Sequence, residues 1–423
     1  MKQKALQIYL SGINHVLPDK LVRAKLLKEG AFLTNIENTY VLSFGKAAYL
    51  MAKAAEEMLD DRITDGLVVT KYGHGGKLKH LKLIESGHPT PDENGVEATK
   101  QAIEIAKKAN ENDLVICLIS GGASSLLADY PEDSSLDDLR NANDQLVNSG
   151  ANILEINSVR KHLSGIKGGQ LAKAIYPATT LSLILSDVVG DKLDVIASGI
   201  TAPDETTFKD ALDVIKKYNL EKSFPKSLLN HLVNGNSGAI PETPKPGDPI
   251  FDLVQNKIIG NNKIALEGAA SKAKELGFET QIITDKLEGD FSHAAELIVN
   301  TINKYNQNRP ACLLFGGEPT VNVTDLGLGG RNQHLALYLA TKIKGNKNAT
   351  ILCAGTDGND GPTDSAGAIV DGNTIEDAKE NDLNPNEFLI EFNSYNFFKH
   401  NGDSIKIGNS GTNVMDLIVV LLN

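Results

Sequence analysis

The chain has 423 residues and a formal net charge of −12. This length is enough for two or three domains with substantial cores, so disulfide or metal staples are not needed. An acidic chain without a concentrated basic stretch is a poor partner for nucleic acid or anionic lipid, so we expect no nucleic acid and no membrane among its partners. A small anionic substrate would have to be bound by a few placed lysine and arginine side chains.

The three cysteines, Cys117, Cys312 and Cys353, all lie in apolar runs and lack CxxC or Cys/His spacing. This pattern predicts buried, reduced thiols rather than a metal or redox site. The first residues lack the apolar core of a signal peptide, and no window approaches the roughly 18 apolar residues that a membrane span requires. We therefore expect a cytoplasmic protein.

Residues 1–37 are predicted to form a helical segment. From Thr39 onward, short apolar runs alternate with helical segments, which is the rhythm of βαβ units around a parallel sheet. The predicted fold class is therefore α/β. The expected strands of the first part are Tyr40–Phe44, Gly66–Thr70, Leu114–Ile119 and Thr180–Ser186, and its expected helices are Lys46–Leu59, Gly95–Ala109 and Phe208–Tyr218.

Residues 219–249 are rich in Pro, Asn, Gly and Ser, which predicts a boundary rather than a packed element. We place a first α/β domain at 38–235, a linker at 236–249 and a second α/β domain at 250–423. The expected helices of the second domain are Asn262–Leu276, His293–Tyr305 and Asn332–Lys342, and its expected strands are Glu279–Thr284, Ala311–Phe315 and Thr350–Cys353.

Lys46 directly follows the expected strand Tyr40–Phe44 and opens a helix. Proteins of the α/β class bind ligands at this end of a strand, and a lysine beside helix N–H groups would suit an anion. A surface lysine that extends into solvent explains the same pattern. The chain has no GxxxxGK[ST] sequence, so this segment is not a P-loop.

Small residues follow the next central strand, where Ser120, Gly121 and Gly122 come directly after Leu114–Ile119. Their N–H and hydroxyl groups can bind a phosphate or a carboxylate, although a tight turn between strand and helix explains them about as well. Neither GxSxG nor a full GxGxxG sequence occurs, which weakens a hydrolase or dinucleotide-binding interpretation.

Two further segments of the first domain carry charged groups that could act on a ligand. Segment 157–169 places Arg160 and Lys161 beside a glycine-rich turn and is the best candidate for binding an anionic substrate, with a solvated helix face as the alternative. Asp187 follows the buried strand Thr180–Ser186. It can act as a base or direct a metal, and it can equally cap the next turn.

In the second domain, an arginine directly follows a glycine-rich loop. Gly316, Gly317 and Glu318 follow a strand, and Arg331 comes directly after Gly329 and Gly330 at the start of a helix. An arginine at a helix N-terminus is suited to binding phosphoryl oxygens, and a plain surface arginine is the alternative.

An acidic loop, residues 355–367, follows the expected strand Thr350–Cys353 and contains three Asp and four Gly residues. Its aspartates repel one another unless a cation or bound ligand compensates them, and carboxylate oxygens suit hard cations such as Mg²⁺. A solvated turn remains the alternative. An EF-hand is excluded, because Gly361 and Pro362 stand where that loop needs a ligand and then its invariant glycine.

Together these segments resemble the MOFRL-type glycerate 2-kinases, a family also labelled hydroxypyruvate reductase. The resemblance covers the chain from about residue 40 to residue 372, with a further match at Thr412–Asp416. The segments that carry it are Phe44–Ala47, Glu85–Asp92, Leu118–Ser125, Asn157–Gly169, Leu185–Asp191, Gly316–Thr320, Gly329–Gln333 and the acidic loop.

The resemblance implies ATP-dependent phosphorylation of D-glycerate at the C2 hydroxyl, with Mg²⁺, to give 2-phosphoglycerate and ADP. It also implies an active site in the cleft between two α/β domains, the larger a Rossmann-like parallel sheet with helices on both faces and the other of MOFRL type. One alternative is an NAD(P)H-dependent hydroxypyruvate reductase, which the missing dinucleotide fingerprint disfavours, and another is a non-catalytic nucleotide-binding regulator. A homodimer is compatible with the sequence, which does not fix the oligomeric state.

The family's catalytic lysine and arginine correspond to Lys46 and Arg331, and Asp187 could accept the proton of the substrate hydroxyl. The sequence does not decide which of the three cations, Lys46, Arg160 and Arg331, would bind the carboxylate and which the phosphoryl group. The expected substrate ligands are Ser120, Gly121, Arg160 and Lys161, the expected nucleotide ligands are Gly316, Gly317, Glu318, Gly329, Gly330 and Asn332, and the expected Mg²⁺ ligands are Asp357 and Asp360.

Overall fold

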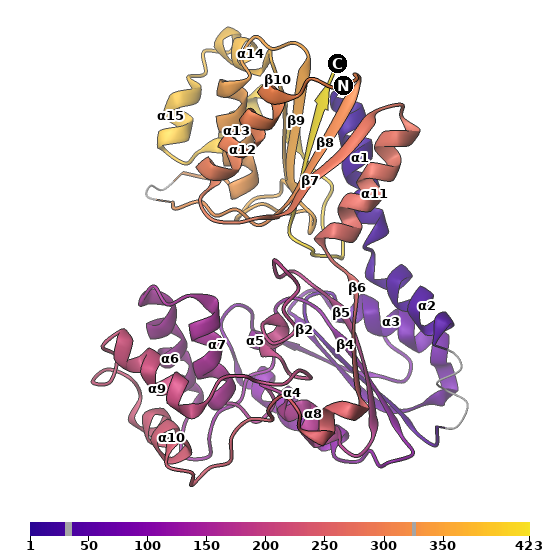
Figure 1. Cartoon of the computed structure of the whole chain (residues 1–423), viewed down its shortest axis with the longest axis vertical. Helices are drawn as coiled ribbons and strands as arrows, with labels where there is room; N and C mark the ends of the chain where they lie inside the picture. Colours follow the sequence, from indigo (N-terminus) through magenta and orange to yellow (C-terminus); the bar gives the residue numbers. More distant parts are fainter. Residues whose placement is uncertain (30–35, 324–326) are drawn as a thin grey trace. The chain divides into compact units, whose positions relative to one another are not determined.

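The computed structural model describes residues 1–29, 36–323 and 327–423. The chain divides into two compact units, each with its own six-stranded sheet (Figure 1). The predicted α/β class is therefore confirmed for both. The first unit comprises Pro18–Ser186 and Asp191–Ile259, and the second comprises Met1–Leu17, Asp187–Gly190 and Gly260–Asn423. Within the described residues, no helix combines the length and the apolar character that a membrane span needs.

The sheet of the first unit has the strand order β3-β2-β1-β4-β5-β6. Its neighbours from β3 to β5 are parallel, and every residue of the central strands β1 and β4 is buried, as expected for a sheet covered on both faces. The order reverses between β1 and β4, and doubly wound sheets bind ligands at this point. The strands are β1 Thr39–Phe44, β2 Ile63–Lys71, β3 Lys82–Ser86, β4 Leu114–Ile119, β5 Thr179–Leu185 and β6 Val254–Gly260.

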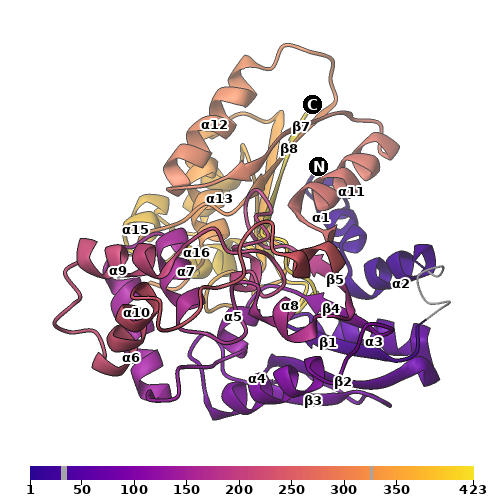
Figure 2. The same cartoon turned by 60° about the horizontal axis from the view of Figure 1, so that its bottom comes forward.

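Helices cover this sheet and also form a separate cluster beside it (Figures 1 and 2). Helix α3 packs on β1, β2 and β4 and against α2, whereas α4 packs on β1 to β3 and against α8. Helices α6, α7, α9 and α10 share a core that includes Val159, Phe208, Phe224 and Leu228. The helices are α2 Pro18–Lys28, α3 Ala48–Leu59, α4 Glu93–Ala106, α5 Ala123–Leu126, α6 Leu136–Asn148, α7 Ile153–His162, α8 Gln170–Ile175, α9 Phe208–Lys217 and α10 Lys226–Asn236.

The structure differs from the expected boundary at 219–249. Helix α10 lies inside this range and buries Leu228 and Leu232 against its neighbours, so the segment is packed. Its proline signal has a local cause, because Pro225 directly precedes the helix. The chain passes from the first unit to the second at Gly260, the last residue of β6. This boundary is late in the sequence because β6 still belongs to the first sheet, beside β5.

The sheet of the second unit is mixed and has the order β11-β10-β9-β12-β8-β7. Strand β12, close to the end of the chain, lies between β8 and β9 and is antiparallel to both, whereas β7 and β8 are parallel. The sequence prediction did not include β12, although Leu417–Leu422 is an apolar run. The strands are β7 Glu279–Leu287, β8 Ala311–Gly317, β9 Ala349–Gly355, β10 Gly367–Asp371, β11 Ser404–Ile405 and β12 Asp416–Leu422.

Two groups of helices cover the two faces of this second sheet (Figure 1). Helices α1 and α11 pack against each other and against β12, and α1 also packs on β9 and α11 on β8. The predicted N-terminal helical segment therefore contributes α1 to the second unit and α2 to the first. On the other face α13 packs on β9 and β10. The helices are α1 Lys2–His15, α11 Asn262–Glu275, α12 Phe291–Lys304, α13 Arg331–Lys342, α14 Thr374–Glu380, α15 Pro385–Ile390 and α16 Ser394–Asn401.

All three cysteines are buried, as the sequence predicted. Burial raises the pKa of the Cys117 and Cys312 thiols to about 12 and raises the pKa of Cys353 as well. These thiols therefore stay protonated at neutral pH.

Candidate active site

Lys46 lies at the carboxyl end of β1, in a loop held by the loop that follows β4. The Lys46 N–H donates to the carbonyl of Gly121 at 2.9 Å, and the Ala47 N–H donates to Ser120 Oγ at 3.1 Å. Gly45 has a φ of +122°, and a Cβ there would lie 2.2 Å from Ser120 Oγ, so this approach of the two loops requires glycine. The backbone of Lys46 is thus fixed at the point where the strand order reverses, with its side chain half-buried.

Ser120 and Gly121 form this support. Besides accepting from Ala47, Ser120 Oγ donates to the Phe44 carbonyl at 3.3 Å, so the hydroxyl has both an acceptor and a donor partner inside the protein. The contacts of Ser120 and Gly121 therefore position Lys46. A direct contact of either residue with substrate stays a prediction.

His88 lies beside Lys46, although it was not among the expected site residues. A Cβ at Gly122 would lie 3.0 Å from His88 Nε2 and 3.2 Å from Lys46 Cγ, so both side chains converge on this glycine. Burial, with the charges of Lys46 and Lys71, lowers the pKa of His88 to about 4. The imidazole is therefore neutral at neutral pH. Its sequence signal was the segment Glu85–Asp92, which contributes to the family resemblance without indicating a role for the histidine.

A cavity of about 300 Å³, here called the small cavity, lies next to these loops. Its wall includes Thr90, two residues after His88, and Ser124, two residues after Gly122, together with Arg160 and Lys167. A volume of this order is at the small end of the range for ligand pockets. The small cavity therefore suits a compact ligand rather than a nucleotide.

Arg160 lines the small cavity and is available to bind an anionic ligand. Its Nε donates to Asn143 Oδ1 at 2.8 Å, and within the described ranges no carboxylate forms an ion pair with it. Burial lowers the pKa of Arg160, but an arginine remains charged at any physiological pH. A partly buried cation without a counter-ion favours binding of an anion.

Lys161 lies elsewhere, although it was expected to act together with Arg160. It is almost fully buried, and its Nζ lies 3.2 Å from Asp204 Oδ1 and 3.4 Å from Asp194 Oδ2. Neighbouring residues of a helix point in different directions, so Arg160 and Lys161 of α7 line different cavities. This geometry favours a structural ion pair for Lys161 over a contact with substrate.

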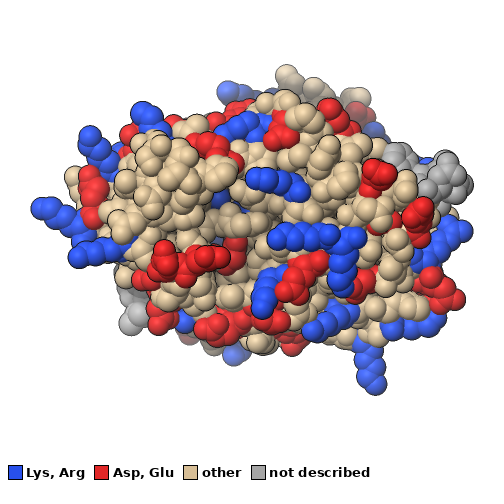
Figure 3. All heavy atoms as spheres, turned by 90° about the horizontal axis from the view of Figure 1, so that it is seen from below, with Lys and Arg blue, Asp and Glu red and all other residues tan. Residues whose placement is uncertain are grey.

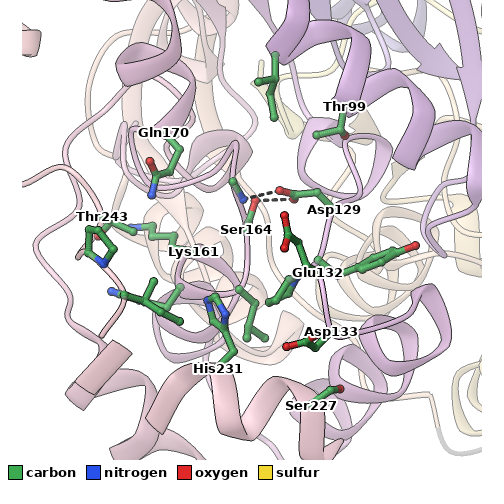
Figure 4. A pocket seen from close by; sticks show the side chains of 18 of the residues that line it. Thr99, Asp129, Glu132, Asp133, Lys161, Ser164, Gln170, Ser227, His231 and Thr243 are labelled. Atoms are coloured by element: carbon green, nitrogen blue, oxygen red, sulfur yellow. Dashed lines mark hydrogen bonds between the residues drawn. The ribbon is translucent and has the colours of Figure 1, made fainter. Parts of the chain in front are cut away.

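Lys161 lines a larger cavity of about 1180 Å³ in the first unit, shown in Figure 4. Here Asp129 accepts hydrogen bonds from the Ser164 hydroxyl and the Gly165 N–H, and Glu132 and Asp133 lie nearby, with His231 also on the wall. Among the described residues that line this cavity, Lys161 is the one site residue expected from sequence. Its size alone therefore does not identify it as the active site.

The face of the molecule in Figure 3 carries lysine and arginine side chains interspersed with aspartate and glutamate. No continuous field of one sign is visible there. On this face an anionic ligand would therefore meet charges of both signs rather than a basic surface.

Arg331 begins α13 and is fixed by two carboxylates. Its Nε and Nη2 donate to the two oxygens of Asp416 at 2.6 and 2.9 Å, and its Nη1 lies 2.9 Å from Glu318 Oε1. Asp416 is fully buried and pairs with Gly317 in the β8–β12 register. Although burial opposes the charge, Asp416 and Glu318 raise the pKa of Arg331, so the guanidinium is held in one orientation at the carboxyl end of β8.

Asp360 in the acidic loop caps the N-terminus of α13. Its Oδ1 accepts from the Asn332 N–H at 3.0 Å and its Oδ2 from the Gln333 N–H at 2.8 Å, and both side-chain amides add further bonds. Burial raises the pKa of Asp360 to about 6, against these hydrogen bonds, which lower it. Both oxygens are already engaged, so this geometry favours a capping role over the expected Mg²⁺ contact.

Asp357 and Asp416 are far apart in the sequence, but both lie near Gly355 in the structure. A Cβ at Gly355 would lie 3.2 Å from Asp357 Oδ1 and 3.5 Å from Asp416 Oδ1. The Tyr9 hydroxyl donates to the Gly355 carbonyl at 2.6 Å, and burial, with the charges of Asp357 and Asp416, raises the pKa of Tyr9. The negative charge that the sequence showed in this loop is thus concentrated around Gly355, and Arg331 partly compensates it through Asp416.

Two protein families match the chain: a domain of unknown function (DUF4147) over residues 4–233 and the MOFRL family over residues 311–416. A D-glycerate 2-kinase of Thermotoga maritima is 42% identical, and the alignment covers 100% of this chain and 98% of that relative. The chain belongs to the glycerate 2-kinase family.

Other members of the glycerate 2-kinase family agree in sequence and in fold. A glycerate 2-kinase of Pyrococcus horikoshii is 41% identical, over 99% of this chain and 94% of that relative. The crystal structure of glycerate kinase from Thermotoga maritima superposes with a TM-score of 0.91 at 41% identity, covering 100% of this chain and 99% of that one. The resemblance stated from the sequence is thus confirmed.

The expected nucleotide-binding glycines of the family pack against protein atoms here. A Cβ at Gly330 would lie 2.3 Å from Asp360, one at Gly329 would lie 2.4 Å from Ser394 Oγ, and one at Gly316 would lie 1.8 Å from Asn262 Oδ1. Gly317 has a φ of +134° and lies against Leu287. Packing alone therefore explains these glycines, and a contact with nucleotide stays a prediction.

Asn332 and Asp187 keep features that a ligand could use. Asn332 is buried, and its Oδ1 has no hydrogen-bond partner in the described structure. Asp187 follows the end of β5 and is half-buried. The predicted roles of Asn332 toward nucleotide and of Asp187 as a base remain predictions.

The Asp360 cap gives a prediction for stability. Because the pKa of Asp360 rises from 3.8 to about 6 on folding, its protonation stabilises the folded state. This contribution is complete below 3.8 and is lost as the pH rises through about 6. Asp360→Asn should remove this pH dependence, measured as the free energy of unfolding in urea at a series of pH values.

At neutral pH two effects of Asp360→Asn oppose each other, because the variant removes a buried charge but leaves one of two backbone N–H groups of α13 without its acceptor. The pH dependence of the free energy of unfolding is therefore the quantity to compare. Asp364→Asn is the matched control in the same loop, since Asp364 is exposed and bonds to Lys406 and Tyr395. Equal pH profiles for Asp360→Asn and the wild type would contradict the raised pKa of Asp360 in the folded state.

Proposed function

We propose that this protein is an ATP-dependent glycerate 2-kinase, which transfers the γ-phosphoryl group of ATP to the C2 hydroxyl of D-glycerate and releases 2-phosphoglycerate and ADP. The observation that carries the proposal is the match, over essentially the whole chain, to relatives named D-glycerate 2-kinase and glycerate 2-kinase. The positions of Lys46, Arg160 and Arg331 support it, because each is a cation placed at a strand end or a cavity.

Phosphoryl transfer requires little covalent chemistry from the protein. It depends on positioning and on positive charge around the transferring group. In this proposal Lys46 and Arg331 supply positive charge to the phosphoryl group. Asp187 accepts the proton of the C2 hydroxyl as that oxygen attacks phosphorus.

The carboxylate of glycerate is best matched by Arg160. Arg331 already makes a bidentate contact with Asp416 and a further contact with Glu318, whereas Arg160 has an amide as its partner and lies on the small cavity. A planar guanidinium binds a carboxylate through two parallel hydrogen bonds. This division leaves Lys46 and Arg331 for the phosphoryl group.

Mg²⁺ would supply positive charge to the phosphate oxygens of ATP. The carboxylates near Gly355 have the oxygen chemistry that Mg²⁺ prefers, and Asp357 fits this role better than Asp360, whose two oxygens cap α13. The described residues also contain an exposed group of three possible metal ligands, Asp60, Asp61 and His80, but Lys79 Nζ lies 2.7 Å from Asp60. We therefore propose Asp357 as the protein ligand of Mg²⁺.

A cytoplasmic location stays a prediction. A homodimer is compatible with the sequence and stays a prediction as well.

The deciding experiment incubates the purified protein with D-glycerate, ATP and Mg²⁺ and identifies the product by ³¹P NMR. ADP should form only when glycerate is present, and the phosphate should be on C2. Phosphate on C3 would contradict the proposed regiochemistry. Oxidation of NADH with hydroxypyruvate, without formation of ADP, would instead favour the reductase.

A further inference from the structure

Lys167 lines the small cavity, and its backbone is fixed on both sides. The Lys167 N–H donates to Ser164 Oγ at 3.1 Å, and the N–H groups of the next two residues donate to backbone carbonyls at 2.9 and 2.7 Å. Those two residues, Gly168 and Gly169, have φ values of +58° and +80°, so this turn requires glycine. The side chain of Lys167 therefore starts from a defined place beside the cavity.

The ammonium group of Lys167 has more donors than the protein has acceptors for it. Only 6% of the residue is exposed. Its Nζ donates to the Leu127 carbonyl at 2.7 Å and lies 3.4 Å from Asp129 Oδ1, which also accepts from the Ser164 hydroxyl at 2.6 Å (Figure 4). An ammonium has three N–H donors, so among the described residues one donor of Lys167 has no acceptor. A buried donor without an acceptor costs free energy, which a ligand oxygen would recover.

Arg160 lines the same cavity of about 300 Å³, so the two cations face one small volume. The guanidinium donates through Nε to Asn143, and the described part of the chain gives its other N–H groups no partner. Burial lowers the pKa of Lys167, Asp129 opposes this shift, and the charge of Arg160 adds to it. An anion bound by both cations would offset their mutual repulsion.

The charged side chains of the cavity wall show what Lys167 contributes to binding. They are three cations, Arg140, Arg160 and Lys167, and two carboxylates, Asp129 and Asp144, which is an excess of one positive charge. Without Lys167 the two signs would be equal in number, and the net charge of the wall would no longer attract an anion. One excess positive charge matches a ligand with a single carboxylate.

We propose that Lys167 is a substrate-binding residue, and that the carboxylate of a small 2-hydroxy acid accepts hydrogen bonds from both Lys167 Nζ and Arg160 in the small cavity. This inference rests on the proposed function, which supplies the acid. Lys161 was expected beside Arg160 and is instead paired with Asp204, whereas Lys167 of the same glycine-rich segment lines the cavity. Asp129 is a positioning residue, because it orients the ammonium.

The test measures the dissociation constant of D-glycerate by calorimetry, without ATP. Lys167→Met keeps most of the side-chain length and removes the charge. It should weaken binding of D-glycerate about 10- to 100-fold, the scale of a lost hydrogen bond to a charged group. Lys173→Met is the matched control, since Lys173 is an exposed lysine of α8, and its affinity for D-glycerate should equal that of the wild type.

A double-mutant cycle with Asp129→Asn separates substrate binding from a purely structural ion pair. If Lys167 served only to neutralise Asp129, the effect of Lys167→Met on affinity would disappear in the Asp129→Asn background. In the proposed role the loss there should remain about tenfold or more. Thermal unfolding of each variant monitors the fold, and if Lys167→Met alone does not fold, the comparison of Asp129→Asn with the double variant decides.

A smaller loss in the Asp129→Asn background would overturn the proposal, as would equal affinities of the wild type and Lys167→Met. A wild type that bound no D-glycerate would overturn it as well. Failure of the proposed function has a different result, because ³¹P NMR would then detect no 2-phosphoglycerate, while the calorimetric cycle, which uses no ATP, would still test the contact of Lys167 with the acid.

Discussion

Replacing Lys46 with Ala is expected to lower kcat for glycerate phosphorylation by about 10²-fold or more, the loss expected for one preorganised charge donor. The loops after β1 and β4 fix the Lys46 backbone, so the reach of its side chain from this strand end is set before the substrate binds. The fold should be retained, because these supporting contacts use backbone atoms and Ser120 rather than the lysine side chain. Steady-state kinetics and thermal unfolding measure the two effects.

The matched control is Lys53→Ala, since Lys53 is an exposed lysine of the same helix, α3, that follows Lys46. Its kcat should equal that of the wild type. Near-normal turnover in Lys46→Ala would show that this lysine does not act on the phosphoryl group.

Replacing Arg331 with Ala should affect both activity and stability. We expect kcat to fall by about 10²-fold or more, again through loss of a positioned charge. The free energy of unfolding should also fall by about 3–5 kcal/mol, because the fully buried Asp416 would lose its bidentate partner. Urea unfolding measures this second effect independently of turnover.

A double variant separates the two consequences of losing Arg331. Adding Asp416→Asn to Arg331→Ala removes the uncompensated charge, so stability should partly recover while kcat stays low. If the double variant regained activity as well, Arg331 would serve mainly to neutralise Asp416. Arg331→Lys keeps the positive charge but loses the bidentate contact with Asp416. Its kcat should lie between those of the wild type and Arg331→Ala.

The helices and strands that the sequence predicted are present because their signals are local. An apolar run of the right length, such as Leu114–Ile119, identifies a strand without knowledge of its partners. The same reasoning could have identified β12, because Leu417–Leu422 is an apolar run. The places of β6 and β12 within their sheets, in contrast, have no local signal. Each takes its place beside a strand far away along the chain, so no short window indicates that β12 lies between β8 and β9.

The candidate site divides in the same way. Lys46 and Arg331 could be selected as candidates from sequence, because each follows a strand or a glycine-rich loop at the start of a helix, and their roles stay predictions. Asp360 could not be distinguished from Asp357 by composition, since its role depends on the N–H groups of α13. The different directions of Arg160 and Lys161 could have been anticipated from helical geometry, as neighbours on a helix do not share a face.

The burial of Cys117, Cys312 and Cys353 gives this chain a practical property. Thiol-reactive dyes attack the thiolate, and these three thiols stay protonated and inaccessible in the folded protein. Cysteines introduced at exposed positions, for example in place of Lys53 on α3 and Lys399 on α16, should then be labelled selectively without removal of the native ones. Energy transfer between two such dyes would report in real time how the separation of the two units responds to ATP and to glycerate.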